Sequence, residues 1–111
     1  MQKGVEMAEQ GIDRNLKKVI RFFAKRLNEN GVDVASIVVF GSHFKGTATS
    51  ESDIDLIVVS KDFRGKDISK RAGLIRNAYT DTIKKFLIPI DLVMETPEEF
   101  NPDFGVVVYA A

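Results

Sequence analysis

Three aspartates inside apolar segments are the residues of this chain whose type and spacing could do chemistry. Asp53 and Asp55 stand at the mouth of the apolar stretch 54–59, and Asp91 interrupts a second apolar stretch, 88–94. Aspartate is depleted in β-strands, so these placements need a compensating interaction. Side chains at positions i and i+2 of a strand point to the same face, which aims Asp53 and Asp55 at one volume.

Binding of a divalent metal is the chemistry that suits such a cluster. Two carboxylates a few ångströms apart raise each other's pKa unless a cation lies between them. Mg²⁺ prefers hard oxygen ligands and takes further ligands from substrate phosphates. If the strand with Asp91 adjoins the strand with Asp53 and Asp55 in register, three carboxylates could hold two metals about 3.5–4 Å apart for phosphoryl transfer.

A second group of residues could bind phosphate. Gly41 and Ser42 open a segment rich in Gly, Ser and Thr, which we expect to form a loop over 41–52. Glycine leaves room for an anion to approach backbone N–H groups, the Ser42 hydroxyl can bond a phosphate oxygen, and Lys45 adds positive charge. Gly46 is expected to adopt the positive φ that closes the turn.

The elements that must position these residues follow from the apolar pattern. Apolar residues at three- and four-residue steps predict helices over 13–30 and 66–86, the first with Asp13 as N-cap and Gly31 after its end. β-branched runs predict buried strands over 34–40, 54–59 and 88–94. The inner stripes expected for the two helices comprise Ile12, Leu16, Val19 or Ile20, Phe23 and Leu27, then Ile68, Ala72, Ile75, Tyr79, Ile83 and Phe86.

The connections are less regular. Residues 61–65 are predicted to be a polar exit from the second strand, and Thr96 to cap a one-turn helix that begins at Pro97. The apolar tail, 105–111, is expected to form a closing strand or a short helix. The order of elements predicts a single α/β or α+β domain over residues 13–111, preceded by an N-terminal lead-in over 1–12.

Charge and composition exclude some classes. The charges of the 16 basic and 16 acidic residues cancel, which argues against a domain whose main task is to bind nucleic acid. The basic side of the first helix is interpreted as solvated surface, with RNA contact as the alternative. Without cysteine there is neither a disulfide nor a thiolate metal site. No apolar run reaches membrane-span length and residues 1–11 lack a signal core, so a soluble, cytoplasmic protein is expected.

The spacing of these motifs resembles a known family. Gly-Ser followed by ten residues and Asp-x-Asp, here GSHFKGTATSESDIDLIVV, resembles the nucleotidyltransferase superfamily of the DNA polymerase β type, in particular its minimal branch. The resemblance covers about residues 13–95, including the later Ile-Asp-Leu-Val segment around Asp91. It implies an α/β (α+β) nucleotidyltransferase fold, a small mixed β-sheet with helices packed on it.

The resemblance also implies roles for the matched residues. Asp53 and Asp55 would bind two Mg²⁺ ions, and Asp91 would bind the catalytic ion and take the proton of the acceptor. Gly41 and Ser42 would hold the triphosphate of ATP or another NTP, and Lys45 matches a position that is often basic. One departure is His43, where many members of the family have arginine directly after the serine.

The function implied is transfer of a nucleoside monophosphate, AMP from ATP, to a hydroxyl acceptor. In the minimal branch the resemblance suggests a helical HEPN-domain partner protein, with this chain acting as antitoxin by adding AMP to that partner. Two alternatives stay open: a catalytically inert binding module that acts by contact, and nucleotide transfer to RNA or a small molecule. The apolar tail could also serve a homo-oligomer or a partner surface.

Overall fold

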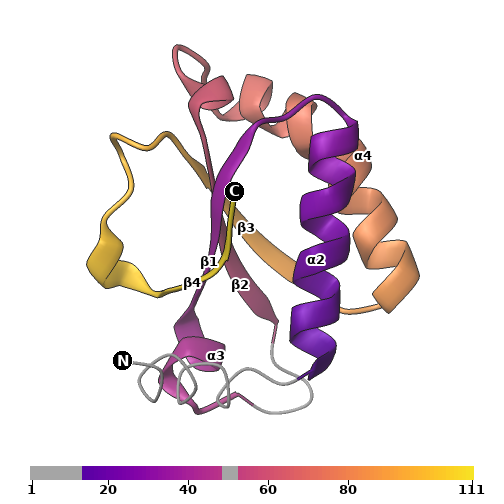
Figure 1. The fold of residues 1–111 in the computed structure, drawn as a ribbon. Coiled ribbons are helices and arrows are strands. Elements are labelled where there is room, and N and C mark those ends of the chain that lie inside the picture. Colours follow the sequence, from indigo (N-terminus) through magenta and orange to yellow (C-terminus); the bar gives the residue numbers. More distant parts are fainter. Residues whose placement is uncertain (1–13, 49–52) are drawn as a thin grey trace.

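The computed structural model describes residues 14–48 and 53–111, so the lead-in over 1–12 and the capping role of Asp13 lie outside the described residues. The long helices lie beside the sheet (Figure 1). In chain order the elements are α2 (Arg14–Glu29), β1 (Val34–Phe40), α3 (Gly41–Lys45), β2 (Ile54–Ser60), η1 (Lys61–Phe63), α4 (Ile68–Phe86), β3 (Ile90–Glu95), η2 (Pro102–Phe104) and β4 (Val106–Ala110).

The four strands form one mixed sheet in the order β3-β2-β1-β4. β1 pairs antiparallel with both β2 and β4, whereas β2 and β3 run parallel. A parallel pair needs a crossover connection, and α4 supplies it. The mixed sheet is confirmed, and the tail forms a strand rather than a helix. Within the described ranges, no helix is both long and apolar enough to cross a membrane.

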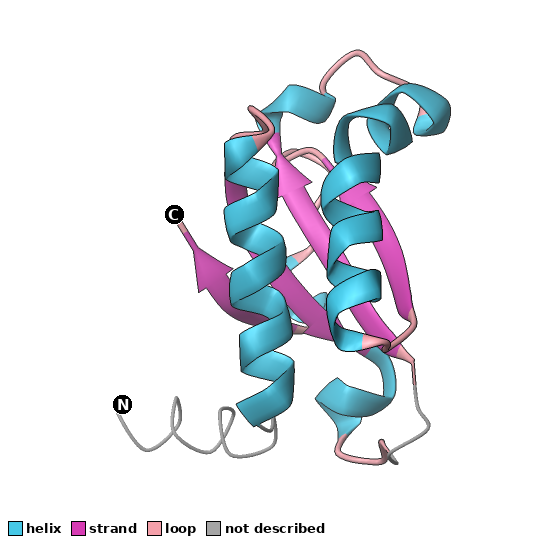
Figure 2. Ribbon diagram, turned by 90° about the vertical axis from the view of Figure 1, so that its right-hand side faces the viewer, coloured by secondary structure: helices cyan, strands magenta, loops and turns pink. Residues whose placement is uncertain are grey.

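Both long helices pack on the same face of the sheet, as Figure 2 shows. The inner stripe predicted for α2 is confirmed over its described members, because Val19, Phe23 and Leu27 are fully buried and Leu16 and Ile20 nearly so. They pack against the side chains of all four strands that point toward the helices. Gly31 has a φ of +86°, the left-handed conformation that suits glycine after a helix.

The stripe predicted for α4 is partly wrong. Ile68 is 77% exposed, while the buried row of this helix is Ile75, Ala78 and Thr82. The helix begins only at Ile68, after Asp67 accepts a hydrogen bond from the Lys70 N–H. The rest of the predicted stripe is largely confirmed, because Ile75, Tyr79, Ile83 and Phe86 pack against the core. Thr82 can be buried because its hydroxyl donates to the Ala78 carbonyl at 2.7 Å.

The segment after β2 is not simply a polar exit. Residues 61–63 form the short helix η1, and Phe63 is fully buried in the core. The Ser60 side chain accepts a hydrogen bond from the Asp62 N–H and its hydroxyl donates to the Asp33 carbonyl. These hydrogen bonds anchor the turn from which Phe63 enters the core. The apolar pattern does not reveal this, because Phe63 is a single aromatic residue inside a polar segment.

The face of the sheet away from the helices has its own smaller apolar cluster. Val38, Ile57 and Val59 are buried there. Phe40 and Phe100 pack against them, and the Phe104 ring lies 5.4 Å from the Phe40 ring. The segment between β3 and β4 therefore covers part of this face; the rest of the face carries the acidic residues described below.

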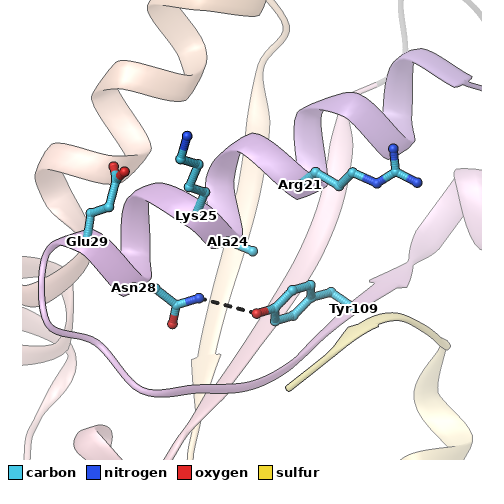
Figure 3. A pocket seen from close by; sticks show the side chains of 6 residues that line it. All are labelled: Arg21, Ala24, Lys25, Asn28, Glu29 and Tyr109. Atoms are coloured by element: carbon cyan, nitrogen blue, oxygen red, sulfur yellow. Dashed lines mark hydrogen bonds between the residues drawn. The ribbon is translucent and has the colours of Figure 1, made fainter.

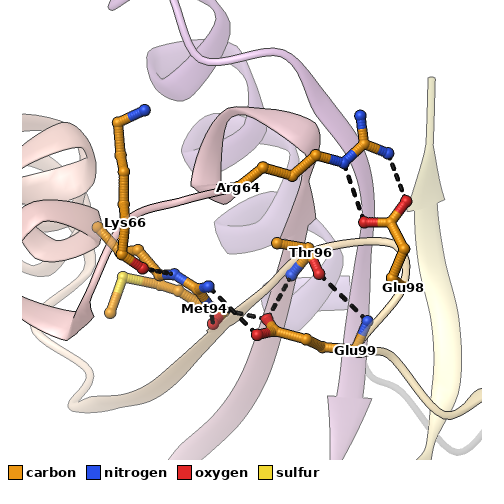
Figure 4. A network of polar contacts seen from close by, with 7 residues as sticks. Arg64, Lys66, Met94, Thr96, Glu98 and Glu99 are labelled. Atoms are coloured by element: carbon orange, nitrogen blue, oxygen red, sulfur yellow. Dashed lines mark hydrogen bonds and ion pairs between the residues drawn. The ribbon is translucent and has the colours of Figure 1, made fainter.

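The turn after β3 is held by reciprocal hydrogen bonds (Figure 4). The Glu99 N–H donates to the Thr96 hydroxyl at 3.2 Å, and the Thr96 N–H donates to Glu99 Oε1 at 2.9 Å. The capping role predicted for Thr96 is confirmed, although residues 97–99 form a turn rather than a helix. Arg71 reaches from α4 to the Met94 carbonyl and to the Glu99 carboxylate, which ties the turn to the helix layer.

Replacing Glu99 with glutamine is expected to remove part of the acid sensitivity of the fold. Hydrogen bonds from Arg71 and from the Thr96 backbone lower the pKa of Glu99 from 4.5 to about 2. The stabilisation from the ionised carboxylate is present above pH 4.5 and lost as the pH falls through the folded-state pKa. Thermal melts of wild type and Glu99→Gln between about pH 7 and pH 2 should converge at the acid end; a constant gap across that range would contradict this.

Candidate active site

Asp55 of β2 and Asp91 of β3 lie directly opposite each other in the parallel pair. Partners in register point to the same side of a sheet, and here it is the side away from the helices, shared with Ile57 and Val59. Phe40, the last residue of β1, is the partner of Asp55 on the other side. The prediction that the two aspartate-bearing strands adjoin in register is confirmed.

The charge balance around Asp55 is unfavourable for an ionised carboxylate. Burial raises its pKa, and so do the neighbouring charges of Asp91 and Asp53 and a side-chain hydrogen bond with Asp91. The charge of His43 acts in the opposite direction, more weakly than either aspartate. No salt bridge to either member of the Asp55–Asp91 pair forms in the described part of the chain. A cation placed between the two carboxylates would relieve this repulsion.

Gly41 makes room for the Asp55 carboxylate. Its φ is +69°, and a Cβ built on it would overlap Asp55 Oδ2 and lie 2.9 Å from Asp55 Cγ. Any other residue would therefore meet both backbone strain and a steric clash. The missing side chain was expected from the sequence to admit an incoming anion; the structure shows that the space admits a carboxylate of the site itself.

The expected loop after Gly41 is wrong over its first residues, which form the short helix α3. Glycines with positive φ lie at both ends, Gly41 at +69° and Gly46 at +78°, so the backbone can turn into and out of a helical turn that composition alone concealed. The Ser42 carbonyl accepts hydrogen bonds from the N–H groups of Gly46 and Thr47. The positive φ predicted for Gly46 is confirmed. Ser42 is partly exposed beside Gly41, and Lys45 is exposed at the end of α3.

His43 lies in α3, not in a loop, and faces the acidic pair closely enough to affect the pKa of Asp55. Its Nε2 atom is buried without a hydrogen-bond partner among the described residues. The sequence alone placed His43 only beside the site. Its distinguishing signal is the departure from the family pattern, since the residue type differs where arginine is common.

The third predicted ligand, Asp53, precedes β2 and is exposed. Its charge adds to the repulsion on Asp55. In the described ranges no three side chains of His, Cys, Asp or Glu are already arranged as a metal shell. Mg²⁺ is commonly held by one or two carboxylates, and substrate phosphates complete its coordination. The Asp55–Asp91 pair can provide the carboxylates. The pair therefore fits a magnesium site, and the full three-carboxylate set stays a prediction.

Known proteins resemble this chain in sequence and in fold. A relative from Methanocaldococcus jannaschii, named "Putative protein adenylyltransferase MJ1305", is 28% identical over 90 residues, which cover 80% of this chain and 60% of the relative. The chain thus spans about three fifths of that protein's length.

Among solved structures, a "putative nucleotidyltransferase" from Sulfolobus solfataricus superposes with a TM-score of 0.61 at 17% identity, over 92% of this chain and 94% of that one. A toxin–antitoxin structure with AMP-PNP superposes with a TM-score of 0.57 at 22% identity, over 86% and 73% of the two chains. At these identities the likeness shows the fold.

The family is shown by a match over most of the chain. The family model of the nucleotidyltransferase domain matches residues 16–108, from the first turns of α2 to β4. This range contains the Gly41-Ser42 corner, the paired aspartates, the first three strands and the beginning of β4. The chain belongs to the nucleotidyltransferase domain family.

Proposed function

We propose that this chain transfers AMP from ATP, with the help of divalent metal, to a hydroxyl group of a partner protein. The observation that carries the proposal is the in-register pairing of Asp55 with Asp91 against the side-chain-free corner at Gly41. Membership of the nucleotidyltransferase domain family supports our proposal that a metal and a nucleoside triphosphate would meet at this constellation.

In the proposed reaction, Asp53, Asp55 and Asp91 would hold Mg²⁺, with two ions in the full complement. Bound there, the metal would neutralise the phosphates and favour in-line displacement. Gly41, Ser42 and Lys45 hold the triphosphate. These assignments are supported by the position of Ser42 next to Gly41 and by the exposed position of Lys45.

Bond changes balance without any further reactant. The acceptor hydroxyl oxygen forms a bond to the α-phosphorus of ATP, and the bond from that phosphorus to the bridging oxygen breaks, releasing pyrophosphate. The proton of the hydroxyl passes to Asp91, whose exposed position at the start of β3 leaves it accessible to an acceptor. Orientation and charge neutralisation supply most of the rate enhancement in such transfers.

The partner we propose is a helical HEPN-domain protein, with this chain as the antitoxin that modifies it. Two findings support a protein acceptor: the name of the M. jannaschii relative and the superposition on a toxin–antitoxin structure that contains a nucleotide analogue. Both findings concern other proteins, and the M. jannaschii relative is longer than this chain.

The test is co-purification of the chain from its native host, followed by intact-mass measurement of bound partners after incubation with ATP and Mg²⁺. We expect the partner mass to rise by one or more AMP units, and α-labelled ATP but not γ-labelled ATP to label it. Chelation by EDTA should stop the labelling. Neutralisation of the partner without any mass increase would instead indicate a module that acts by contact.

A further inference from the structure

A groove of about 430 Å³ lies between α2 and β4, on the helix-covered side of the sheet (Figure 3). The Asn28 amide donates from the helix to the Tyr109 hydroxyl oxygen at 3.2 Å, which ties the helix to the strand. The Tyr109 ring packs on the core beneath the helices, so the groove and the Asp55–Asp91 pair lie on opposite faces of the sheet. The residues that line the groove are Arg21, Ala24, Lys25, Asn28, Glu29 and Tyr109.

Two cations of the groove have no counter-ion among residues 14–48 and 53–111. Arg21 and Lys25 are both exposed, and their i, i+4 spacing puts them on one side of α2. The neighbouring Arg26 shows the contrast, because it is paired with Asp81 across to α4 and with Glu29 at 2.9 Å. The positive charge on the side of α2 that faces α4 is therefore balanced by carboxylates of the chain. The positive charge on the side above β4 is not balanced by the described residues.

The strand below these cations lies at the edge of the sheet. β4 is the last strand of the sheet and pairs only with β1 in the part of the chain that the structure describes. Its sequence, Val-Val-Val-Tyr-Ala, contains no proline and no charged residue, two of the devices that discourage an edge from accepting another strand. Its pairing with β1 does contain a register shift, between the partners of Ile37 and Val38. Val107 is 49% exposed.

We propose that the outer edge of β4 and this groove bind an extended acidic segment of a partner protein. Main-chain groups of the segment would form hydrogen bonds with β4. Every second side chain of the segment would then face the helices and reach the groove. Carboxylates there would meet Arg21 and Lys25, while apolar groups would cover the Tyr109 ring. This surface is separate from the proposed reaction centre.

Charge argues against the other occupants. A second copy joined edge to edge through β4 would bring two sets of unpaired cations together. Nucleic acid would also gain from Arg21 and Lys25, but its backbone cannot complete a strand ladder with β4.

The test selects a random peptide display library on the full chain and counter-selects on the Arg21→Glu/Lys25→Glu variant. We expect enriched peptides with acidic residues at alternate positions. For the consensus peptide, fluorescence anisotropy should show binding that falls about tenfold or more in the charge-reversal variant. The matched control is Lys70→Glu/Arg76→Glu, which makes the same charge change at exposed positions of α4 and should bind as wild type does.

Strand pairing is tested separately with the same peptide. N-methylation at alternate residues should abolish binding, and hydrogen exchange of the β4 amides should slow in the complex. Circular dichroism checks that each variant is folded. Enrichment of non-acidic peptides, unchanged binding by the reversal variant, tighter binding of a uridine oligonucleotide at the same residues, or self-association through β4 would each overturn the proposal. Binding should persist in an Asp55→Asn variant, which separates this surface from the activity.

Discussion

Replacing Asp55 with asparagine is expected to abolish AMP transfer, by about a thousandfold or more, because electrostatic stabilisation usually contributes more to such catalysis than any other effect. Asparagine keeps the shape of the side chain beside Gly41 but removes the negative charge that would hold metal. Label transfer from α-labelled ATP to the co-purified partner measures the loss.

The same variant should be no less stable than wild type when metal is absent. Burial and the charges of Asp91 and Asp53 raise the pKa of Asp55 in the folded state, so its ionised form destabilises the fold at neutral pH. Stability linked to this group is complete below the ordinary value of 3.8 and is lost as the pH rises through the folded-state pKa. In EDTA, Asp55→Asn should melt at or above the wild-type temperature at about pH 7, with the gap closing toward acid pH. A lower melting temperature at neutral pH would show that Asp55 supports the fold.

Replacing Gly41 with alanine is expected to be almost as damaging, for a steric reason. The new methyl group would overlap Asp55 Oδ2, and the φ of +69° would add backbone strain of about 1 kcal/mol. The carboxylate must move, and a small displacement of a catalytic group can cost about a hundredfold in rate. Both the rate of AMP transfer and the melting temperature should fall.

Gly46→Ala is the matched control, because this glycine has a similar φ of +78° but no atom within 4 Å of the position that a Cβ would take. It carries the backbone strain without the clash, so it should lose stability while transfer activity stays near wild type. Equal loss of activity in the two variants would mean that the turn, and not the contact with Asp55, limits the reaction.

Much of the fold could be predicted because local patterns and tertiary packing agree. In α2 the apolar stripe is one continuous row over the sheet, so its period was plain. Strand β1 has predicted and observed bounds that coincide at Val34 and Phe40. The inner row of α4 was predicted less well, since Thr82 is buried through a hydrogen bond to its own helix that composition does not reveal.

The candidate site likewise has one part that could be predicted from the sequence and one part that could not. The pairing of Asp55 with Asp91 could be predicted because acidic residues inside apolar strands are conspicuous and parallel strands align their faces. The contact of Gly41 with Asp55 and the helical turn of α3 could not, because both depend on how β1 and β2 approach each other in space. His43 shows the same limit: its residue type was noticed, but the burial of its Nε2 arises only from the assembled fold.

The parallel pairing of β2 and β3 has a consequence for folding. Asp55 and Asp91 come together only after α4 has crossed over and β3 has docked, a non-local step that costs chain entropy before it gains contacts. A partly folded chain therefore has no carboxylate pair to offer. Mg²⁺ with ATP would bind only the completed arrangement. A higher concentration of Mg²⁺–ATP in the cell would therefore raise the free energy needed to open this edge of the domain.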